Sequence, residues 1–215
     1  MTQMTQDARF WDRTARKYAQ DPIADLAGYE RTLEATAQRL QPGHRVLELG
    51  CGTGSTALRL APGVSHYLAT DLSGQMIAIA REKAEAAGLK TLNFEVATPE
   101  AAPWPDGHFD IVLAFNLLHL VADRRAALGS IHRVLKPGGL FISKTPCLKE
   151  MSPWLRAALV VLPLMQALGQ APRVTALNAA DLEADLTAAG FEILERARHG
   201  SGVRDFRPYV VAVRG

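Results

Sequence analysis

The chain has 215 residues, of which 48% are apolar and 21% are charged, and these values exclude an intrinsically disordered chain and favour one globular domain. The formal net charge is only +2, and the Lys and Arg residues are scattered along the chain. A nucleic-acid-binding protein usually concentrates such residues in a stripe, so we expect no nucleic-acid partner.

Neither the cysteines nor the apolar stretches indicate export or membrane insertion. Cys51 and Cys147 give no metal-ligand spacing and no disulfide framework, which favours a reducing, cytoplasmic compartment and no bound metal. Residues 1–10 lack the basic start and apolar core of a signal peptide. The most apolar stretch, residues 154–168, contains Arg156 and Pro163 and is shorter than the roughly 20 residues of a spanning helix, so we expect no stable membrane insertion.

Two helices are predicted ahead of a sheet. Residues 7–20 and 29–40 carry apolar side chains at helical spacing, and the break at residues 41–43 ends the second helix.

From residue 45 to residue 144 the pattern alternates between strands and helices. Strands are predicted at 45–49, 66–70, 92–96, 109–115 and 140–144, and helices at 55–60, 73–87 and 123–135, with one more short helix between the third and fourth strands. This alternation predicts a doubly wound parallel sheet with right-handed crossovers.

The last third of the chain differs. We expect an apolar helical segment at 151–169, a capped helix at 178–189, and two antiparallel strands at 191–198 and 208–214, which close the sheet with a reversed edge strand. The prediction is one domain over residues 1–215, made of N-terminal helices (1–40), a cofactor-binding core (41–145), a helical insertion (146–175) and a closing helix with a strand pair (176–215).

Several polar or small residues lie at or just after the predicted strand ends. Because ligands of doubly wound sheets bind beyond the carboxyl ends of the strands, we expect these residues to converge in space: Gly50, Asp71, Thr98, Asn116 and Thr145.

The first strand runs directly into a glycine loop. The residues Val46 to Gly54 have the sequence VLELGCGTG, and glycine allows a ligand to approach the backbone closely. Ser55 and Thr56 supply hydroxyl groups for capping the helix that follows. Strand, glycine loop and helix N-terminus together predict a nucleotide-like site.

Dinucleotide enzymes use a similar loop, G-x-G-x-x-G, in the same place. Counted from Gly50 this pattern fails at Ser55, whereas counted from Gly52 its looser form fits, with Ala57 in the last position. Glu48 ahead of the glycines would repel a pyrophosphate but suits a cationic amine. An amine-bearing cofactor is favoured, and a nicotinamide cofactor stays open as the alternative.

The loop E-L-G-C-G-T-G resembles motif I of the class I S-adenosylmethionine-dependent methyltransferases. The resemblance continues through Asp71-Leu72-Ser73-x-x-Met76-Ile77, through the segment from Pro103 to Asp110, through Leu118-His119, and through residues 134–139. The resemblance covers roughly residues 40–145. Within the family, these motifs are similar to those of the branch of ubiquinone and menaquinone biosynthesis methyltransferases. The resemblance implies a seven-stranded Rossmann-like sheet with the last strand antiparallel, S-adenosylmethionine as cofactor and S-adenosylhomocysteine as product.

The resemblance also implies a set of cofactor contacts. Glu48 would lie near the amino group, Asp71 would accept hydrogen bonds from the ribose hydroxyls, and Tyr18 would come from a helix that folds over the cofactor. The methionine part would meet Gly50, Cys51, Gly52 and Gly54, and the adenine would meet Leu72 and Met76. For Asp71 a role as helix N-cap is an alternative compatible with the first.

The chain departs from the family pattern after the third strand. Many relatives have an acidic residue followed by Ala there, to bind the adenine amino group, whereas this chain has Ala97-Thr98-Pro99. Thr98 or the backbone would take that role, and Asn116, after the fourth strand, would face the sulfonium and the acceptor.

Methyl transfer needs a base only for some acceptors, and His119 is the candidate that the motif places near the site. A packed histidine is the equal alternative, because the neighbouring residues Leu117, Leu118, Leu120 and Val121 are apolar.

The acceptor is expected to bind between the N-terminal helices and residues 146–173. This insertion includes Trp154, Leu155 and Leu164, and we interpret it as a lid lining a hydrophobic pocket, with ordinary core packing as the alternative.

The sequence thus predicts a methyltransferase acting on O, N or C of a small, hydrophobic acceptor, as a monomer or homodimer. The alternatives are a nicotinamide-dependent oxidoreductase and a non-catalytic S-adenosylmethionine-binding module.

Overall fold

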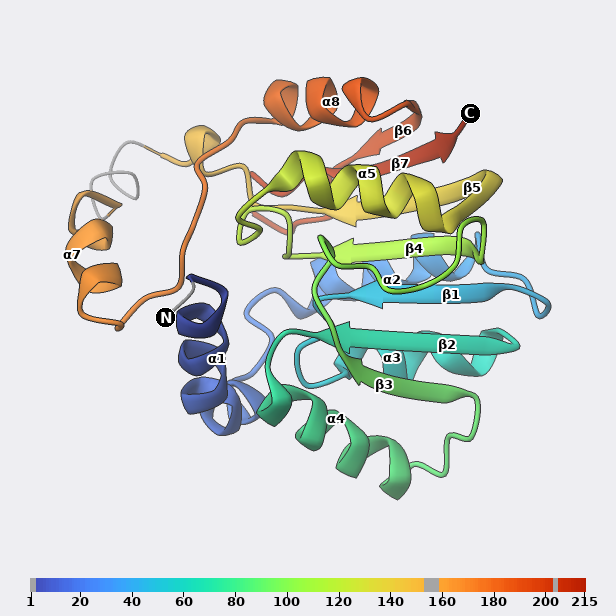
Figure 1. Ribbon diagram of the computed structural model, residues 1–215, viewed down its shortest axis with the longest axis horizontal. Coiled ribbons are helices and arrows are strands. Elements are labelled where there is room, and N and C mark those ends of the chain that lie inside the picture. Colours follow the sequence, from blue (N-terminus) through green and yellow to red (C-terminus); the bar gives the residue numbers. More distant parts are fainter. Residues whose placement is uncertain (1–2, 153–158, 203–204) are drawn as a thin grey trace.

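The computed structural model describes residues 3–152, 159–202 and 205–215, and it contains one seven-stranded sheet (Figure 1). The strand order is β3-β2-β1-β4-β5-β7-β6. The bounds are β1 Arg45–Leu49, β2 His66–Asp71, β3 Leu92–Val96, β4 Phe109–Phe115, β5 Leu135–Lys144, β6 Phe191–Ala197 and β7 Tyr209–Arg214. The first five strands are parallel, so the predicted fold class is confirmed.

The antiparallel strand lies inside the sheet rather than at its edge. β7 pairs antiparallel with β5 on one side, as in Leu140 with Val213, and with β6 on the other, as in Phe191 with Arg214. The expected reversed edge strand is therefore wrong in position. The edge is β6, because the buried run from Tyr209 to Ala212 has neighbours on both sides.

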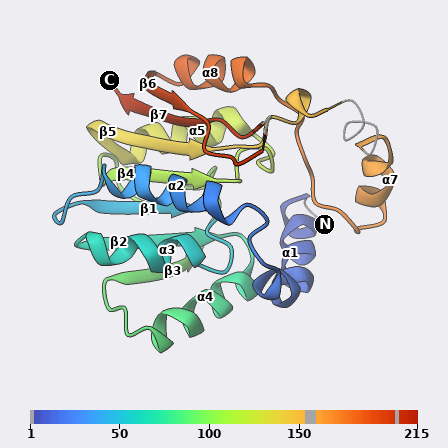
Figure 2. The ribbon, with the colours of Figure 1, turned by 180° about the vertical axis from the view of Figure 1, so that it is seen from behind.

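Helices cover both faces of the sheet. On one face lie α2 (Leu26–Ala37), α3 (Ser55–Leu60) and α4 (Gly74–Ala86), whose side chains share a core with Val46 and Tyr67 (Figure 2). On the other face α5 (Arg124–Val134) and α8 (Ala179–Ala188) pack against Leu47 and Leu49. Alternate residues of β1 therefore face opposite cores, as the two-residue period of a strand requires.

The first helix, α1 (Gln3–Gln20), lies beyond the carboxyl ends of the parallel strands, where Figure 1 shows the arrowheads of β1, β2 and β4 pointing toward it. It packs beside α4, and the Ser73 hydroxyl donates a hydrogen bond of 2.6 Å to Asp12. The helix thus covers the end of the sheet where ligands of such folds bind.

Three local expectations are wrong. No helix forms between β3 and β4, where Pro99, Pro103 and Pro105 remove backbone donors. The N-cap of α3 is Gly54, without a side-chain cap, so the hydroxyls of Ser55 and Thr56 do not cap it.

The third concerns β5, which begins at Leu135 and not at Leu140. Leu135 pairs with Phe109 before the register shifts and Leu140 pairs with Ile111.

The segment after β5 is only partly helical. Its described parts form short 3-10 turns at Leu148–Glu150 and Leu159–Val161 and the short helix α7 (Leu162–Ala167), instead of one helix over 151–169. Pro163 lies in the first turn of α7, as its missing N–H allows. Trp154 and Leu155 lie outside the described residues. Within the described part of the chain, no helix is long and apolar enough to cross a membrane.

Candidate functional site

A cavity of about 750 Å³ opens at the carboxyl ends of β1, β2, β4 and β5. Its wall includes residues from α1, α2, the glycine loop and the loops after β2, β3 and β4. Of the five residues expected to converge here, Gly50, Asp71, Thr98 and Asn116 line the cavity, whereas Thr145 does not and Lys144 takes its place.

The glycine loop forms one wall, and its glycines differ in what they permit. Gly50 and Gly52 line the cavity with φ angles of +68° and +55°. A Cβ atom on Gly52 would meet only the Tyr18 ring, at 3.5 Å, so the backbone here is open to a ligand. Cys51, between them, also lines the cavity.

Gly54 does not belong to the cavity wall, contrary to the sequence-based expectation. Its φ angle is +79°, and a Cβ atom there would lie 2.9 Å from the Cβ of Ala80 and 3.2 Å from the ring of Phe94. This glycine therefore serves the close approach of α3 to α4 and β3.

Glu48 places a buried carboxyl group at the cavity. It is only 3% exposed, and its Oε2 accepts a hydrogen bond of 2.8 Å from the hydroxyl of Tyr67. Burial raises the pKa of Glu48 to about 7, the Tyr67 hydrogen bond opposes this rise, and the charge of Asp71 adds to it. A cation beside Glu48 would stabilise its ionised form.

Asp71 is the second buried carboxylate of the wall. Its Oδ2 accepts a hydrogen bond of 3.0 Å from the Gly52 N–H, and its Oδ1 accepts one of 2.9 Å from the Ser73 N–H. Burial raises the pKa of Asp71, and these two donors oppose the rise. The N-cap of α4 is Ser73, which accepts from the Met76 N–H, so the N-cap alternative for Asp71 is wrong.

Of the remaining residues expected to contact the cofactor, all but one line the cavity. Those that line the cavity are Tyr18, Leu72, Met76, Thr98 and Asn116, whereas Ala97 does not. The Ala97 N–H instead donates to the carbonyl oxygen of Asp71, as a backbone link between the ends of β2 and β3. Asn116 has a φ angle of +54°, and its N–H donates to the Lys144 carbonyl oxygen at 2.7 Å, which fixes the end of β4 against that of β5.

His119 is not brought to the cavity wall. Its Nδ1 is buried without a hydrogen-bond partner among the described residues, and burial lowers the pKa of His119 to about 4. The geometry matches the packed histidine and gives no support to the base.

Sequence reasoning missed the polar side chains at the other end of the cavity, which are Asp25, Thr32, Lys144 and Arg207. Lys144 is 5% exposed. Its position could have been predicted from the sequence, because Lys144 is the last residue of β5 and ligands bind at the carboxyl ends of such strands. Asp25 and Arg207 have no local signal, because they reach the cavity from a helix cap and from the loop before β7.

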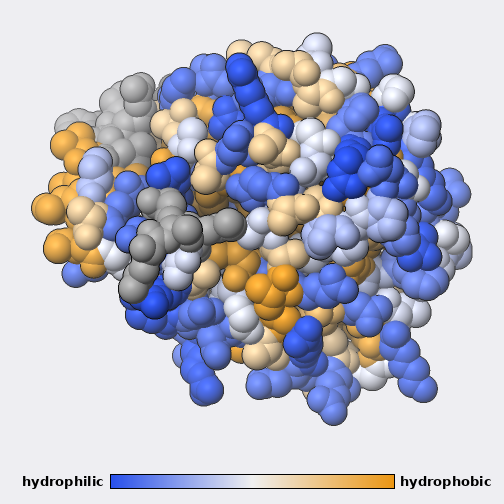
Figure 3. Space-filling view, viewed as in Figure 1, coloured by the Kyte–Doolittle hydropathy of each residue, from blue (hydrophilic) through white to orange (hydrophobic). Residues whose placement is uncertain are grey.

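The described part of the insertion, residues 146–152 and 159–173, does not line the cavity with a run of apolar side chains, as the lid interpretation required. Its contribution to the wall is Pro172 and Arg173, and no residue of α7 is buried. The side chains of Val160, Leu164 and Leu168 are exposed, and Figure 3 shows hydrophobic surface where α7 lies. Helix α7 is therefore neither core nor pocket lining, whereas Cys147 and Leu148, earlier in the insertion, are buried.

Strand order, glycine loop and paired carboxylates at the strand ends define a Rossmann-like domain of the methyltransferase type. Residues 47–143 match the family model described as a methyltransferase domain. The matched residues carry a methyltransferase domain, and the chain is similar to class I S-adenosylmethionine-dependent methyltransferases, including curated relatives from ubiquinone and menaquinone biosynthesis.

Two curated relatives and one solved structure illustrate the similarity. The chain is 32% identical over 143 residues to the methyltransferase YcgJ of Bacillus subtilis, covering 65% of this chain and 54% of that protein. It is 42% identical over 123 residues to the demethylmenaquinone methyltransferase of Thermus thermophilus, covering 55% and 54%.

The crystal structure of Bacillus subtilis YcgJ superimposes with a TM-score of 0.67 at 19% identity, over 86% of this chain and 98% of that one, which shows the shared fold. The chain spans about half the length of the curated relatives it matches.

Proposed function

We propose that this protein binds S-adenosylmethionine in the cavity and transfers its methyl group to a small acceptor with an apolar body. The observation that carries the proposal is the pair of buried carboxyl groups, Glu48 and Asp71, on either side of an open glycine loop. Their chemistry fits an ammonium group and a ribose diol respectively. Two buried carboxyl groups do not fit a pyrophosphate, which would place four like-charged groups together.

Different residues of the wall would bind different parts of the cofactor. Glu48 would hold the amino group, the backbone of Gly50, Cys51 and Gly52 would contact the methionine part, and Asp71 would accept from the ribose hydroxyls. Leu72 and Met76 supply apolar surface for the adenine, and Thr98 follows the strand end where the family binds the adenine amino group. Tyr18 reaches the loop from α1, with its ring 3.5 Å from the position of a Cβ atom on Gly52.

When bound, the cofactor supplies an electrophilic methyl carbon and a leaving group that departs neutral. The protein's own contribution is then orientation, which can supply roughly 7–11 kcal/mol of the barrier reduction. Asn116 is fixed beside the acceptor end of the cavity by its bond to the Lys144 backbone. The mechanism assigns no base to His119.

The acceptor class is inferred from the rest of the wall. Apolar side chains also line the cavity, among them Ile23, Leu33, Phe115, Leu120 and Val121. They fit a small hydrophobic body, in agreement with a relative whose name specifies demethylmenaquinone. The methylated atom would be O, N or C.

A thermal-shift comparison tests the cofactor. S-adenosylhomocysteine should raise the unfolding temperature, with an increase that grows with the logarithm of its concentration above the Kd, and NAD should not. Stabilisation by NAD alone would establish the oxidoreductase instead.

An acceptor panel tests catalysis, with S-adenosylhomocysteine release as the signal. Tight cofactor binding without turnover across a broad panel would favour the non-catalytic binding module.

A further inference from the structure

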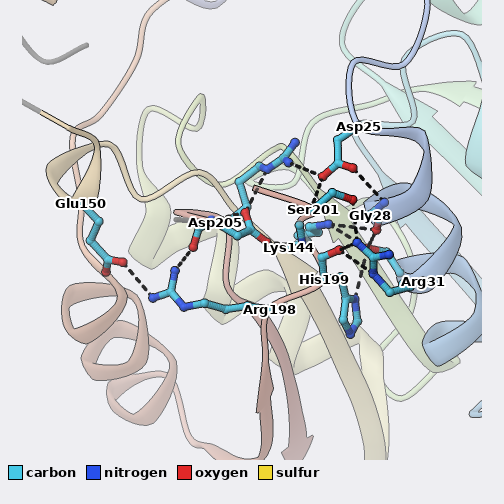
Figure 4. Close-up of polar contacts among 12 residues, drawn as sticks. Asp25, Gly28, Arg31, Lys144, Glu150, Arg198, His199, Ser201 and Asp205 are labelled. Carbon is cyan, nitrogen blue, oxygen red and sulfur yellow. Dashed lines mark hydrogen bonds and ion pairs between the residues drawn. The ribbon is translucent and has the colours of Figure 1, made fainter. Parts of the chain in front are cut away.

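Lys144 is a buried cation at the cavity wall. Its Nζ donates a hydrogen bond of 2.8 Å to the hydroxyl of Thr32 and one of 3.4 Å to the carbonyl oxygen of Gly28, both on α2 (Figure 4). An ammonium group has three donors, so one N–H of Lys144 has no partner within the described part of the chain. Both partners are neutral, and burial lowers the pKa of Lys144.

The carboxylates nearest to Lys144 are engaged elsewhere. Asp25 accepts from the N–H groups of Gly28 and Ser201, and Asp205 accepts from that of Gly200. Arg207 bonds to both carboxylates at 3.3 Å.

No described acidic group lies within ion-pair distance of Lys144. A charge this deeply buried is costly without an opposite charge beside it.

The position of Lys144 separates it from the cofactor end of the cavity. Glu48 lies on β1 and Asp71 on β2, whereas Lys144 ends β5, on the other side of β4. Its side chain points to Gly28 and Thr32 of α2. The ammonium group therefore belongs to the acceptor end.

We propose that Lys144 binds an anionic oxygen of the methyl acceptor, so that the substrate class is a small apolar acid. The inference rests on the proposed function and specifies its acceptor. The anionic oxygen is that of a carboxylate or of an acidic phenol, and it takes the free N–H of Lys144 and supplies the missing counter-charge. Arg207, in the same wall, is paired with Asp25 and Asp205, so Lys144 is the cation at this end whose counter-charge the acceptor would supply.

Binding of matched probe pairs to the protein saturated with S-adenosylhomocysteine tests the proposal by titration calorimetry. The pairs are benzoate with benzamide, 2-naphthoate with 2-naphthamide, and, at pH 8.5, 4-nitrophenolate with 4-nitroanisole. In at least one pair the anion should bind about 10- to 100-fold more tightly, because a charge-assisted bond replaces a neutral one. The first two pairs report a carboxylate site, and the third a phenolate site.

The variant Lys144→Met should reduce that preference to below about threefold, and Lys144→Arg should retain part of it. The matched control is Lys83→Met, because Lys83 also donates to a threonine hydroxyl, at 3.0 Å to Thr53, but lies outside the cavity wall. This control should leave the preference unchanged.

Two results would overturn the proposal: wild-type protein that prefers no anion in any pair, or a preference that survives Lys144→Met. A Lys144→Met variant that is folded but binds S-adenosylhomocysteine more weakly would also overturn it, because the ammonium would then serve the cofactor's carboxylate. Wild-type protein that does not bind S-adenosylhomocysteine at all would instead remove the proposed function itself, and the titration that precedes the probe experiment detects that case.

Discussion

The two ends of the cavity differ in their charged groups and are built in different ways. The acidic end consists of Glu48 and Asp71, and its carboxylates lie next to a loop that the chain forms locally. The other end, called the basic end for the ammonium group of Lys144, also holds Arg207 paired with Asp25, and both cations meet α2 or its N-cap only through tertiary contacts. One end is encoded in a contiguous motif, and the other depends on segments far apart in sequence.

The family match follows this division. Residues 47–143 include Glu48, the glycine loop and Asp71, whereas Asp25, Lys144 and Arg207 all lie outside them. Local motifs therefore carry the part of the site proposed for the cofactor, whereas the charged side chains of the acceptor end come from outside the matched residues.

The largest effect is expected at Gly54, where the acidic end depends on helix packing. Gly54→Ala should lower the free energy of unfolding by about 2–5 kcal/mol, because its φ angle is +79° and the new Cβ would lie 2.9 Å from that of Ala80. Chemical denaturation measures the change. Gly63→Ala is the control, since nothing lies within 4 Å of its Cβ position, and an equal loss in both variants would refute the packing role.

Glu48→Gln should weaken cofactor binding and raise the free energy of unfolding. The pKa of Glu48 in the folded protein, about 7, lies above the ordinary value of 4.5 for a glutamate. The penalty for burying its ionised form is thus absent below pH 4.5 and complete above pH 7. The variant should gain up to about 3 kcal/mol of unfolding free energy at pH 8 and almost none at pH 4.5. Thermal unfolding at both pH values checks this, and a gain at pH 4.5 equal to that at pH 8 would contradict it.

The same residue predicts a pH dependence of cofactor binding. A ligand ammonium beside Glu48 favours its ionised form, so affinity for S-adenosylhomocysteine should rise as pH increases toward about 7 and then level off. In Glu48→Gln this rise should disappear. Calorimetric titration from pH 5.5 to 8.5 measures it, and an unchanged profile in the variant would remove Glu48 from the amino group.

Asp71→Ala should weaken S-adenosylhomocysteine binding by roughly 1.5–3 kcal/mol, about 10- to 100-fold, through loss of charge-assisted bonds. Asp71→Asn should lose less, because an amide oxygen still accepts the N–H of Gly52 or Ser73. Neither variant should change the anion preference at the basic end. Unaltered cofactor affinity would exclude Asp71 from the ribose.

The smallest effect is expected at His119. His119→Phe should leave S-adenosylhomocysteine affinity unchanged and alter stability by less than about 1 kcal/mol, because the buried Nδ1 has no described partner to lose. Loss of turnover with intact folding and cofactor binding would instead support His119 as a catalytic base.

The core of the fold was predictable because its signals are local. Strands β1, β3 and β4 begin and end where apolar runs meet glycine, proline or polar residues, as in Phe109–Phe115. The position of β7 was not predictable, because its pairing with both β5 and β6 depends on tertiary contacts and not on the local sequence pattern. Likewise the motif could not separate Gly52, open to the cavity, from Gly54, packed against Ala80.

The contact between Ser73 and Asp12 has a thermodynamic consequence. Ser73 caps α4, donates its N–H to Asp71 and donates its hydroxyl to α1. Docking of α1 and order at the Asp71 end of the cavity therefore share one residue and form a coupled equilibrium. A ligand that fixes Asp71 should slow amide hydrogen exchange in α1, and by reciprocity a weakened α1 contact should cost ligand affinity.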